Sequence, residues 1–406
     1  MKKVNQYFFN LLLFLFIFLL PTQFGKHFFL SFSYISGIRI DYLSYAFYTT
    51  DILAVLLIFI KRQKIISFFK KKNVLTILLI LALSVFFSFS PAIAFYKYLK
   101  ILEIISIFVV FKNSQINKKL LLYSLLSGAI LQLSLSFYQI INHRSVQGFL
   151  YFLGERYFTS SVPGIAKASL NGVEFLRPYG TFSHPNSLAG FYLLIYSLVL
   201  GIDMKNNPLL KNFFLIVCTM LILISFSKAA IFGLILINLI ALKKTYNKAF
   251  CKFCSVSRTM VLILISMVFF YSKTDPLSIF KRAELVKNSL HIISTYPITG
   301  AGLGNYLLVQ DKIFTNSLIF PPQPVHNIFL LLISEVGIFL SGAIIFLLLK
   351  YFYKYRKYNS LIYCAIVILI TGSFDHYWFT LQQNMLCLVF VLSLITNSQV
   401  LFERSR

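Results

Sequence analysis

A short polar stretch at residues 177–190, RPYGTFSHPNSLAG, stands out in a chain otherwise rich in apolar runs. It places Arg177, His184 and Asn186 directly before an apolar window, together with two prolines. Proline is tolerated in the first turn of a helix, and Asn186 or Ser183 can accept hydrogen bonds from first-turn amides, so helix capping explains part of the motif. Capping does not explain Arg177. A guanidinium ahead of free helix amides would form an anion site that can bind phosphate oxygens in a bidentate manner.

Arg282 is a second basic residue that could bind an anion. The segment 277–294 around it has helical periodicity, and at about 100° per residue its apolar side chains form one stripe, which predicts an amphipathic helix at a membrane interface. That stripe consists of Ile279, Ala283, Val286, Leu290 and Ile293. Arg282 falls about 60° from the centre of the stripe. It therefore either snorkels toward water or points at a site between this helix and the rest of the protein.

His326 and Asn327 follow three prolines and begin another apolar window. They could be a polar start to a helix, or His326 could act as a base, because a neutral imidazole accepts a proton near physiological pH. Glu335 lies opposite His326 on a helical wheel and roughly 13 Å deeper. It cannot orient His326, and its burial predicts a polar contact between helices.

The glycine-rich segment 300–305, GAGLGN, is not a nucleotide-binding loop, because the dinucleotide fingerprint needs a preceding strand and a following helix. We expect a tight turn whose backbone lies close to a neighbouring chain or a ligand. Metal chemistry is not expected. The acidic residues are scattered, no Asp-x-Asp motif is present, and Cys251 and Cys254 have no further cysteine or histidine nearby to complete a zinc site. The sequence therefore predicts neither a metal nor a cofactor.

The elements that must position these residues are apolar. With 58% hydrophobic residues, 17% aromatic residues and a mean hydropathy of +0.79 over 406 residues, the chain cannot form a soluble core with a polar surface. We predict an all-α polytopic membrane protein of about twelve transmembrane helices. The apolar windows fall at 7–24, 43–60, 74–89, 92–111, 120–142, 187–204, 209–225, 229–242, 259–272, 327–349, 359–374 and 379–396.

The distribution of positive charge predicts the orientation. Lys and Arg gather in the segments that fall on the side of the N-terminus when the windows alternate, so the positive-inside rule places both termini in the cytoplasm. The net charge of +26 is dispersed as short clusters at helix ends, which indicates anionic membrane lipids rather than nucleic acid. All six histidines then fall on the outer side. Taken singly, His27, His143 and His376 are best explained as interfacial residues at helix ends.

This topology divides the chain into alternating membrane and outer-loop parts. Loops as long as the two outer ones are functional or disordered, and these two are too rich in aromatic and aliphatic residues to be disordered. In chain order the parts are 1–142 with five helices, 143–186 as an outer loop, 187–272 with four helices, 273–325 as a large outer loop and 326–406 with three helices.

Short motifs follow one another between residues 175 and 345. They are Arg177-Pro-x-Gly-x-Phe-x-His-Pro-Asn-x-Leu-Ala before a helix, Ser227-Lys228-Ala229 between two helices, Arg282-x-x-Leu, Pro297-x-x-Gly-x-Gly-x-Gly-Asn-Tyr306, His326-Asn-x-x-Leu and Glu335-x-Gly337-Ile. In order and placement they resemble the O-antigen ligase and polymerase family. That family often has arginine where this chain has Lys228, a difference that keeps the charge but loses bidentate geometry.

The resemblance implies a metal-independent glycosyltransferase of the GT-C-like membrane class, active in cell-surface polysaccharide biosynthesis. The donor would be a glycan on a polyprenyl diphosphate, and the acceptor a hydroxyl of a glycan, a lipid or a protein at the non-cytoplasmic face of the cell membrane. By motif match, the diphosphate would be bound by Arg177, Arg282 and Lys228, the base or acceptor-positioning residue would be His326, and support would come from His184, Asn186 and Asn327. Fixed cations suit a diphosphate leaving group, because its negative charge grows as the glycosidic bond breaks.

A transporter or flippase for a lipid-linked or anionic substrate is the alternative class. Asp51, Lys97, Lys100 and Glu103 fall in apolar windows and could form a polar pathway. Lys100 and Glu103 are one helical turn apart, however, and could pair with each other. The matching broken helices of twin transporter halves are not apparent in the sequence.

Overall fold

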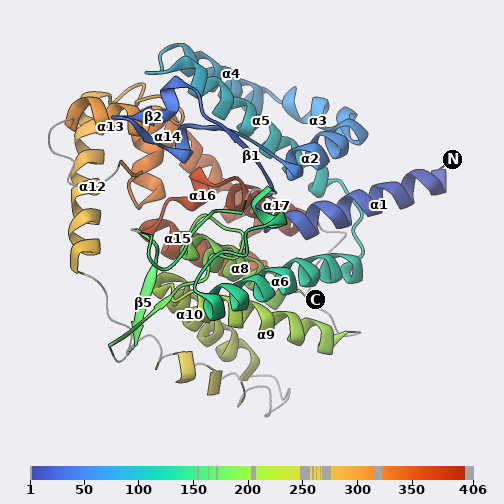
Figure 1. Ribbon diagram of the computed structural model, residues 1–406. Helices are drawn as coiled ribbons and strands as arrows, with labels where there is room; N and C mark the ends of the chain where they lie inside the picture. The colour runs from blue at the N-terminus through green and yellow to red at the C-terminus, as the bar shows by residue number, and fades with distance from the viewer. Residues whose placement is uncertain are drawn as a thin grey trace.

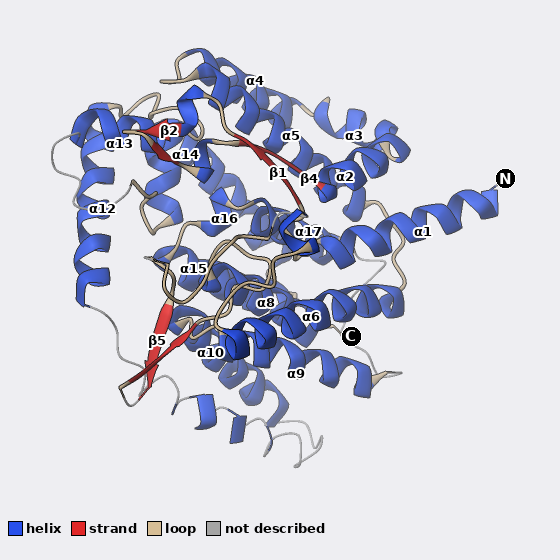
Figure 2. Ribbon diagram, in the orientation of Figure 1, coloured by secondary structure: helices blue, strands red, loops and turns tan. Residues whose placement is uncertain are grey.

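The computed structural model describes residues 2–152, 155–162, 164–170, 172–202, 207–246, 276–314 and 322–397, with isolated positions between 257 and 267. The described chain is mostly helical (Figure 2). Its helices of eight residues or more are α1 Lys2–Leu19, α2 Thr49–Ile60, α3 Arg62–Phe69, α4 Lys72–Phe86, α5 Pro91–Lys112, α6 Lys118–Asn142, α8 Pro185–Leu200, α9 Pro208–Ile224, α10 Lys228–Tyr246, α12 Pro276–Thr295, α13 Tyr306–Phe314, α14 Ile328–Tyr355, α15 Asn359–Phe374 and α17 Gln382–Thr396. The short ones are α7 Phe149–Phe152 and α16 Tyr377–Thr380, with 3₁₀ turns at Ser31–Ser33 and Asp41–Leu43.

Two helices, α6 and α14, are long and apolar enough to cross a membrane. Shorter apolar helices of 10–17 residues include α2, α4, α8, α9, α15 and α17. Each predicted apolar window except 259–272 coincides with a helix, and that window lies mostly outside the described residues. The window 43–60 begins too early, because residues 45–48 form a strand and α2 starts at Thr49.

Helix α8 forms the centre of the fold. All residues from 187 to 199 are buried, because α9, α10, α15 and α17 pack around the helix. A helix surrounded in this way has to be apolar on every side, and that explains the uninterrupted apolar run after the SHPN motif. Helix α17 packs against both α8 and α5 and so joins the two ends of the chain in one core (Figure 1).

Three two-stranded antiparallel sheets depart from the predicted all-α class. Strand β1 Gly25–Phe28 pairs with β4 Tyr45–Tyr48, β2 Tyr34–Ile35 with β3 Ile38–Arg39, and β5 Lys167–Leu170 with β6 Val173–Leu176. Ser36 and Gly37 join β2 to β3 with φ of 49° and 77°, as a two-residue hairpin turn requires. The sheets lie in the two segments that precede α2 and α8, outside the apolar helices.

The glycine-rich segment 300–305 holds α12 against α14, which stand together at one side of the molecule (Figure 1). Gly337 interrupts α14 with a φ of 79°, and the carbonyl groups of Ser334 and Glu335 there accept hydrogen bonds from the N–H groups of Ala301 and Gly302, each at 2.8 Å. Gly300 and Gly302 also have positive φ, and a Cβ at Gly300 would overlap the Glu335 backbone. The predicted tight turn close to a neighbouring chain is confirmed.

Candidate functional site

A cavity of about 1570 Å³ opens where the first turns of α8, α10 and α14 meet α12 and the segment before α16. Most of the residues predicted as a site line this one cavity although they come from four different parts of the chain. They are Arg177, His184, Asn186, Lys228, Arg282 and His326. The remaining one, Asn327, is not among the lining residues.

Two buried glutamines of α6 position the loop that carries Arg177. The Gln139 side-chain oxygen accepts hydrogen bonds from the N–H groups of Tyr179 and Gly180, both at 2.9 Å. Gln132 accepts from the Thr181 N–H at 2.9 Å and donates to the Thr181 hydroxyl at 2.7 Å. Buried backbone groups need such partners, so α6 fixes the entry of the chain into α8. In the sequence these glutamines look like ordinary polar interruptions of an apolar window, and their spacing does not indicate a role.

Arg177 is a half-buried cation that two hydrogen bonds hold in place. Its Nε donates to the Ser225 carbonyl at 2.7 Å, and Nη2 donates to the Asn186 side-chain oxygen at 2.6 Å. Burial lowers the pKa of the guanidinium to about 10, so Arg177 stays charged at neutral pH. A guanidinium carries five N–H donors, and these two bonds leave others to face the cavity.

His184, rather than Asn186 or Ser183, caps α8. The His184 Nδ1 accepts a hydrogen bond from the Asn186 N–H at 3.1 Å. This capping role was assigned to the wrong side chain in the sequence analysis, because the amide of Asn186 is used elsewhere: its nitrogen donates to Asp375 Oδ2 at 2.9 Å while its oxygen accepts from Arg177. Asn186 therefore connects the arginine to a carboxylate.

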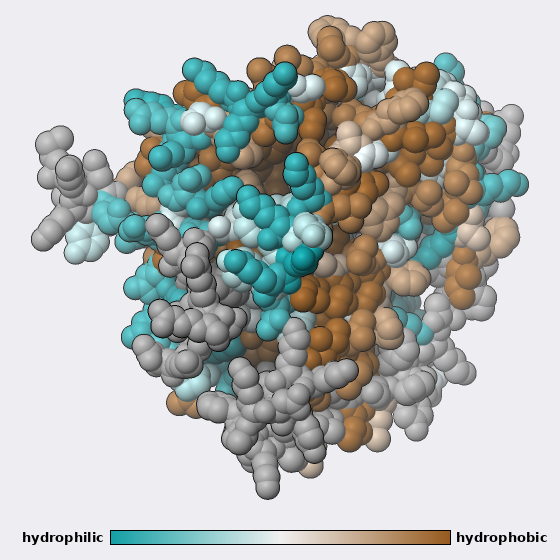
Figure 3. Space-filling view, turned by 180° about the vertical axis from the view of Figure 1, so that it is seen from behind, coloured by the Kyte–Doolittle hydropathy of each residue, from teal (hydrophilic) through white to brown (hydrophobic). Residues whose placement is uncertain are grey.

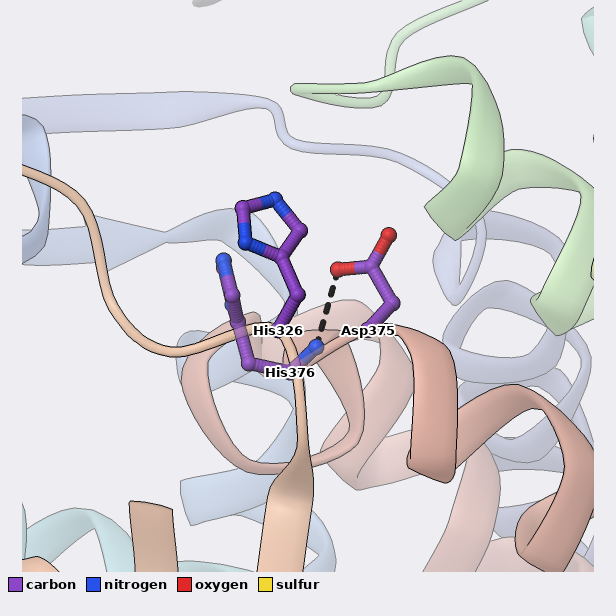
Figure 4. Close-up of side chains that lie close together, drawn as sticks. All are labelled: His326, Asp375 and His376. Carbon is purple, nitrogen blue, oxygen red and sulfur yellow. Dashed lines mark hydrogen bonds between the residues drawn. The ribbon is translucent and has the colours of Figure 1, made fainter. Parts of the chain in front are cut away.

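Asp375 and His376 are site residues that the sequence analysis missed. Both are buried and line the cavity. Asp375 Oδ1 accepts from the His376 N–H at 2.8 Å, and the rings of His326 and His376 lie 5.2 Å apart between centroids (Figure 4). We expected His376 to be an interfacial residue at a helix end. The sequence feature that could have identified these two site residues is the polar pair Asp375-His376 between two apolar windows.

The charges in this cluster are set by burial and by one another. Burial lowers the pKa of His326 to about 3, and it also lowers the pKa of His184 and His376. Burial alone would raise the pKa of Asp375, but the three histidines and the Asn186 amide lower it below its usual range. At neutral pH the site thus holds neutral imidazoles, one carboxylate and the guanidinium of Arg177.

Helix α12 carries Arg282 to the cavity, in agreement with the second of the two alternatives expected for this residue. The side chains that pack against the rest of the protein are Leu285, Asn288, Ser289 and Ile292. The predicted apolar stripe faces outward instead, with Ile279 and Leu290 exposed by 60% and 53%. The polar surface of α14 explains the difference, because Ser289 and Ser334 share a hydrogen bond of 2.8 Å.

Asn327 is the polar start of α14 that the sequence offered as one alternative, and Glu335 makes its hydrogen bond to the glycine-rich loop. Asn327 caps α14 by accepting from the N–H groups of Phe329 and Leu330, at 2.9 and 3.0 Å. Glu335 is buried and accepts from the Gly304 N–H at 2.8 Å. This hydrogen bond joins α14 to the glycine-rich loop, and Glu335 also interacts electrostatically with Lys97 of α5, in line with the predicted polar contact between helices.

Two other histidines that were expected at helix ends, His27 and His143, lie in different surroundings. His27 lines the cavity, but both ring nitrogens lie within hydrogen-bond distance of protein hydroxyls, Ser44 at 2.7 Å and Tyr48 at 3.2 Å. His143 is exposed at the end of α6. Cys251 and Cys254 lie outside the described residues.

Among known proteins, the chain matches no family model and no curated protein. The chemistry of the cavity thus has to be argued from its residues. It combines a fixed guanidinium, a second arginine, a lysine and a neutral, buried histidine, which together can bind an anion beside a proton acceptor.

Proposed function

We propose that the chain is a membrane glycosyltransferase of the O-antigen ligase and polymerase type. It would transfer or polymerise a glycan from a polyprenyl diphosphate donor onto an acceptor hydroxyl at the non-cytoplasmic face, without a metal. The observation that carries this proposal is the cavity that brings Arg177, Arg282, Lys228 and His326 together. Those residues belong to the separate motifs on which the family resemblance rests.

The proposal places the cavity at the outer end of about twelve membrane-spanning helices in a GT-C-like arrangement, with both termini in the cytoplasm. Support comes from the length and apolar character of α6 and α14. Large apolar side chains are also exposed on outward-facing helices, such as Phe86 of α4 by 77% and Phe339 of α14 by 74%. Figure 3 shows apolar side chains covering a broad part of one face, with hydrophilic ones gathered toward one side. A lipid environment suits such a surface.

In the proposed reaction His326 accepts the proton of the acceptor hydroxyl as its oxygen attacks the anomeric carbon. The bond from that carbon to the diphosphate oxygen breaks, and the diphosphate leaves with the electron pair. Arg177 and Arg282 bind the leaving group, whose charge they stabilise more strongly as it develops. The low pKa of His326 leaves its lone pair available, and the negative charge of a bound donor would raise its basicity.

A transporter or flippase remains the second class, but three of its four candidate pathway residues, Asp51, Lys100 and Glu103, pair with one another. Lys100 forms ion pairs with Asp51 and with Glu103, the latter at 3.4 Å. Asp51 also accepts from Gln382 and from the Tyr48 N–H. A closed network of this kind suits a structural role for α2 and α5.

The test is transfer in detergent with a purified polyprenyl-diphosphate glycan and a hydroxyl acceptor, with and without EDTA. The proposal predicts glycosylated acceptor and free polyprenyl diphosphate in equal amounts, at the same rate in both conditions. Donor translocation across vesicles without any cleavage would favour the flippase instead.

A further inference from the structure

His326, Asp375 and His376 form a cluster that the proposed transfer reaction does not fully use. Each residue offers one potential ligand atom, and these atoms all lie within 4.8 Å of one another. Figure 4 shows the two imidazole rings beside each other with the Asp375 carboxylate turned toward them. His326 and His376 come from chain segments on either side of α14 and α15, so the fold, not local sequence, assembles the group.

His326 provides a second, independent observation. Its Nδ1 is buried and makes no hydrogen bond within the part of the chain that the structure describes. A buried polar nitrogen without a partner is costly, and a bound ion would satisfy it. In the sequence the acidic residues are scattered, which predicts no metal site, but the fold brings Asp375 next to two histidines.

The donor set indicates the class of ion. Two imidazole nitrogens and one carboxylate oxygen suit zinc and other late first-row divalent ions, whereas magnesium and calcium prefer oxygen alone. The three potential ligand atoms lie within 4.8 Å of one another. Tetrahedral zinc, with bonds of about 2.0–2.1 Å, needs ligand atoms that are closer together than 4.8 Å, so small side-chain rotations must complete the site. The fourth position would face the cavity.

Neighbouring side chains already orient two of the ligands. The His376 Nδ1 lies 2.8 Å from the Thr380 hydroxyl, which leaves Nε2 for the ion. Asp375 Oδ2 accepts from the Asn186 amide at 2.9 Å. Contacts of this kind fix ring orientation and carboxylate direction in metal sites. Arg177 and Arg282 lie near enough to affect the charges of this cluster, and their positive charge opposes a cation, so binding should be reversible.

We propose that His326, Asp375 and His376 bind one divalent transition-metal ion of the zinc class, and that this ion inhibits the enzyme. Inhibition rests on the proposed function, because a metal bound to His326 occupies the lone pair that would accept the acceptor proton. The transfer itself needs no metal. The site would therefore make a metal-independent transferase sensitive to free zinc.

Metal binding is tested on the full chain in detergent after EDTA treatment and removal of the chelator. We expect one Co²⁺ per chain with the visible absorption of tetrahedral cobalt, displaced by Zn²⁺. Asp375→Asn, His326→Gln and His376→Gln should each weaken binding at least about 10-fold, since even outer contacts of a metal site contribute that much. The matched control is His143→Asn, because His143 is exposed, has a φ of 54° that asparagine tolerates, and lies outside the cavity.

No stoichiometric cobalt binding, or binding that survives all three substitutions, would overturn the site. Loss of binding in His143→Asn would do the same. Comparing three single variants keeps the result decisive when one of them fails to fold, which size-exclusion elution would reveal. This measurement uses no donor and no acceptor, so it stands even if the proposed transfer is never observed.

Inhibition is tested by transfer assays at increasing free zinc. Wild type should lose activity as zinc reaches its dissociation constant, and EDTA should restore it. His376→Gln should need at least roughly 10-fold more zinc for the same fractional loss. Zinc that binds at one equivalent but leaves the rate unchanged would contradict the inhibitory role while the binding site remained.

Discussion

Arg177, Asn186 and Asp375 form one hydrogen-bonded chain across the cavity wall, with the Asn186 amide between cation and carboxylate. The arrangement keeps the charges apart, so the guanidinium is held in place without a direct ion pair that would neutralise it. A cation fixed in this way needs no reorganisation when it meets a developing negative charge. Arg177 is therefore suited to the diphosphate, while Arg282 approaches the same space from the separate helix α12.

Arg282 gives the first prediction. Arg282→Lys should lose most transfer activity, because lysine keeps the charge but not the bidentate geometry that a diphosphate accepts. Lys287→Ala should keep near-normal activity, since Lys287 is an exposed residue of the same helix and does not line the cavity. Initial rates at saturating acceptor would compare the two. Equal tolerance at both positions would mean that Arg282 only snorkels.

The second prediction concerns pH. Because the pKa of His326 is lowered to about 3 from 6.5, the imidazole is the neutral base throughout ordinary assay conditions, and it loses that function only as pH falls through the lowered pKa. With donor varied and EDTA present, kcat/KM should therefore be flat between about pH 5 and 8. An acidic limb with an inflexion near the ordinary histidine value would contradict the buried, neutral state.

At the scale of elements, helix positions followed from the sequence while contacts between them did not. The long apolar runs of α8 and α14 both predicted helices, but only α8 is apolar because it is packed on all sides, whereas α14 leaves large apolar side chains such as Phe339 exposed. The short strand pairs were not predicted. Each needs a tight turn, such as Ser36-Gly37 between β2 and β3, and a turn of two residues is hard to recognise in a sequence. The side of α12 that packs against the protein did not follow from the apolar stripe, because hydrophobic periodicity cannot reveal that its partner α14 presents Ser334.

The site was predictable to the extent that its residues sit in local motifs. Arg282 lies within the amphipathic segment 277–294, whereas Arg177, His184 and His326 stand before apolar windows, where polar residues are conspicuous. Asp375 and His376 share that position, but their significance depends on contact with His326, which only the packing of α14 and α15 creates. Gln132 and Gln139 of α6 act through backbone groups of a distant loop, and no pattern within α6 indicates this.

The break in α14 gives the third prediction. Gly337→Ala should destabilise the protein by about 1–3 kcal/mol or more, since its backbone conformation suits glycine and a Cβ would overlap the Ile298 carbonyl group. Gly342→Ala is the matched control in the same helix, where no atom lies within 4 Å of the added Cβ. Thermal unfolding in detergent should show a lower midpoint only for Gly337→Ala. Equal midpoints would mean that α12 and α14 do not depend on this junction.

At the scale of the whole molecule, the proposal depends on which side of the membrane the cavity faces. Cysteine at Ser160 should react with an impermeant thiol reagent from outside intact cells, whereas cysteines at Lys71 and Lys354 should not. All three positions are exposed, and the background requires replacement of the native cysteines, of which Cys218, Cys364 and Cys387 are buried. Reversed labelling would place the cavity in the cytoplasm and remove its proposed role.

The most direct test of the central claim measures donor affinity and turnover separately for His326→Ala and Arg177→Ala, with and without EDTA. His326→Ala should lower turnover by roughly 100-fold or more, as removal of a general base does, while donor affinity stays close to that of wild type. Arg177→Ala should weaken donor binding as well as turnover, because one charge-assisted contact to phosphate contributes about 1.5–3 kcal/mol. EDTA should change neither result. A His326→Ala protein with a near-normal rate would reduce His326 to a structural residue, and a rate abolished by EDTA would contradict the metal-independent reaction.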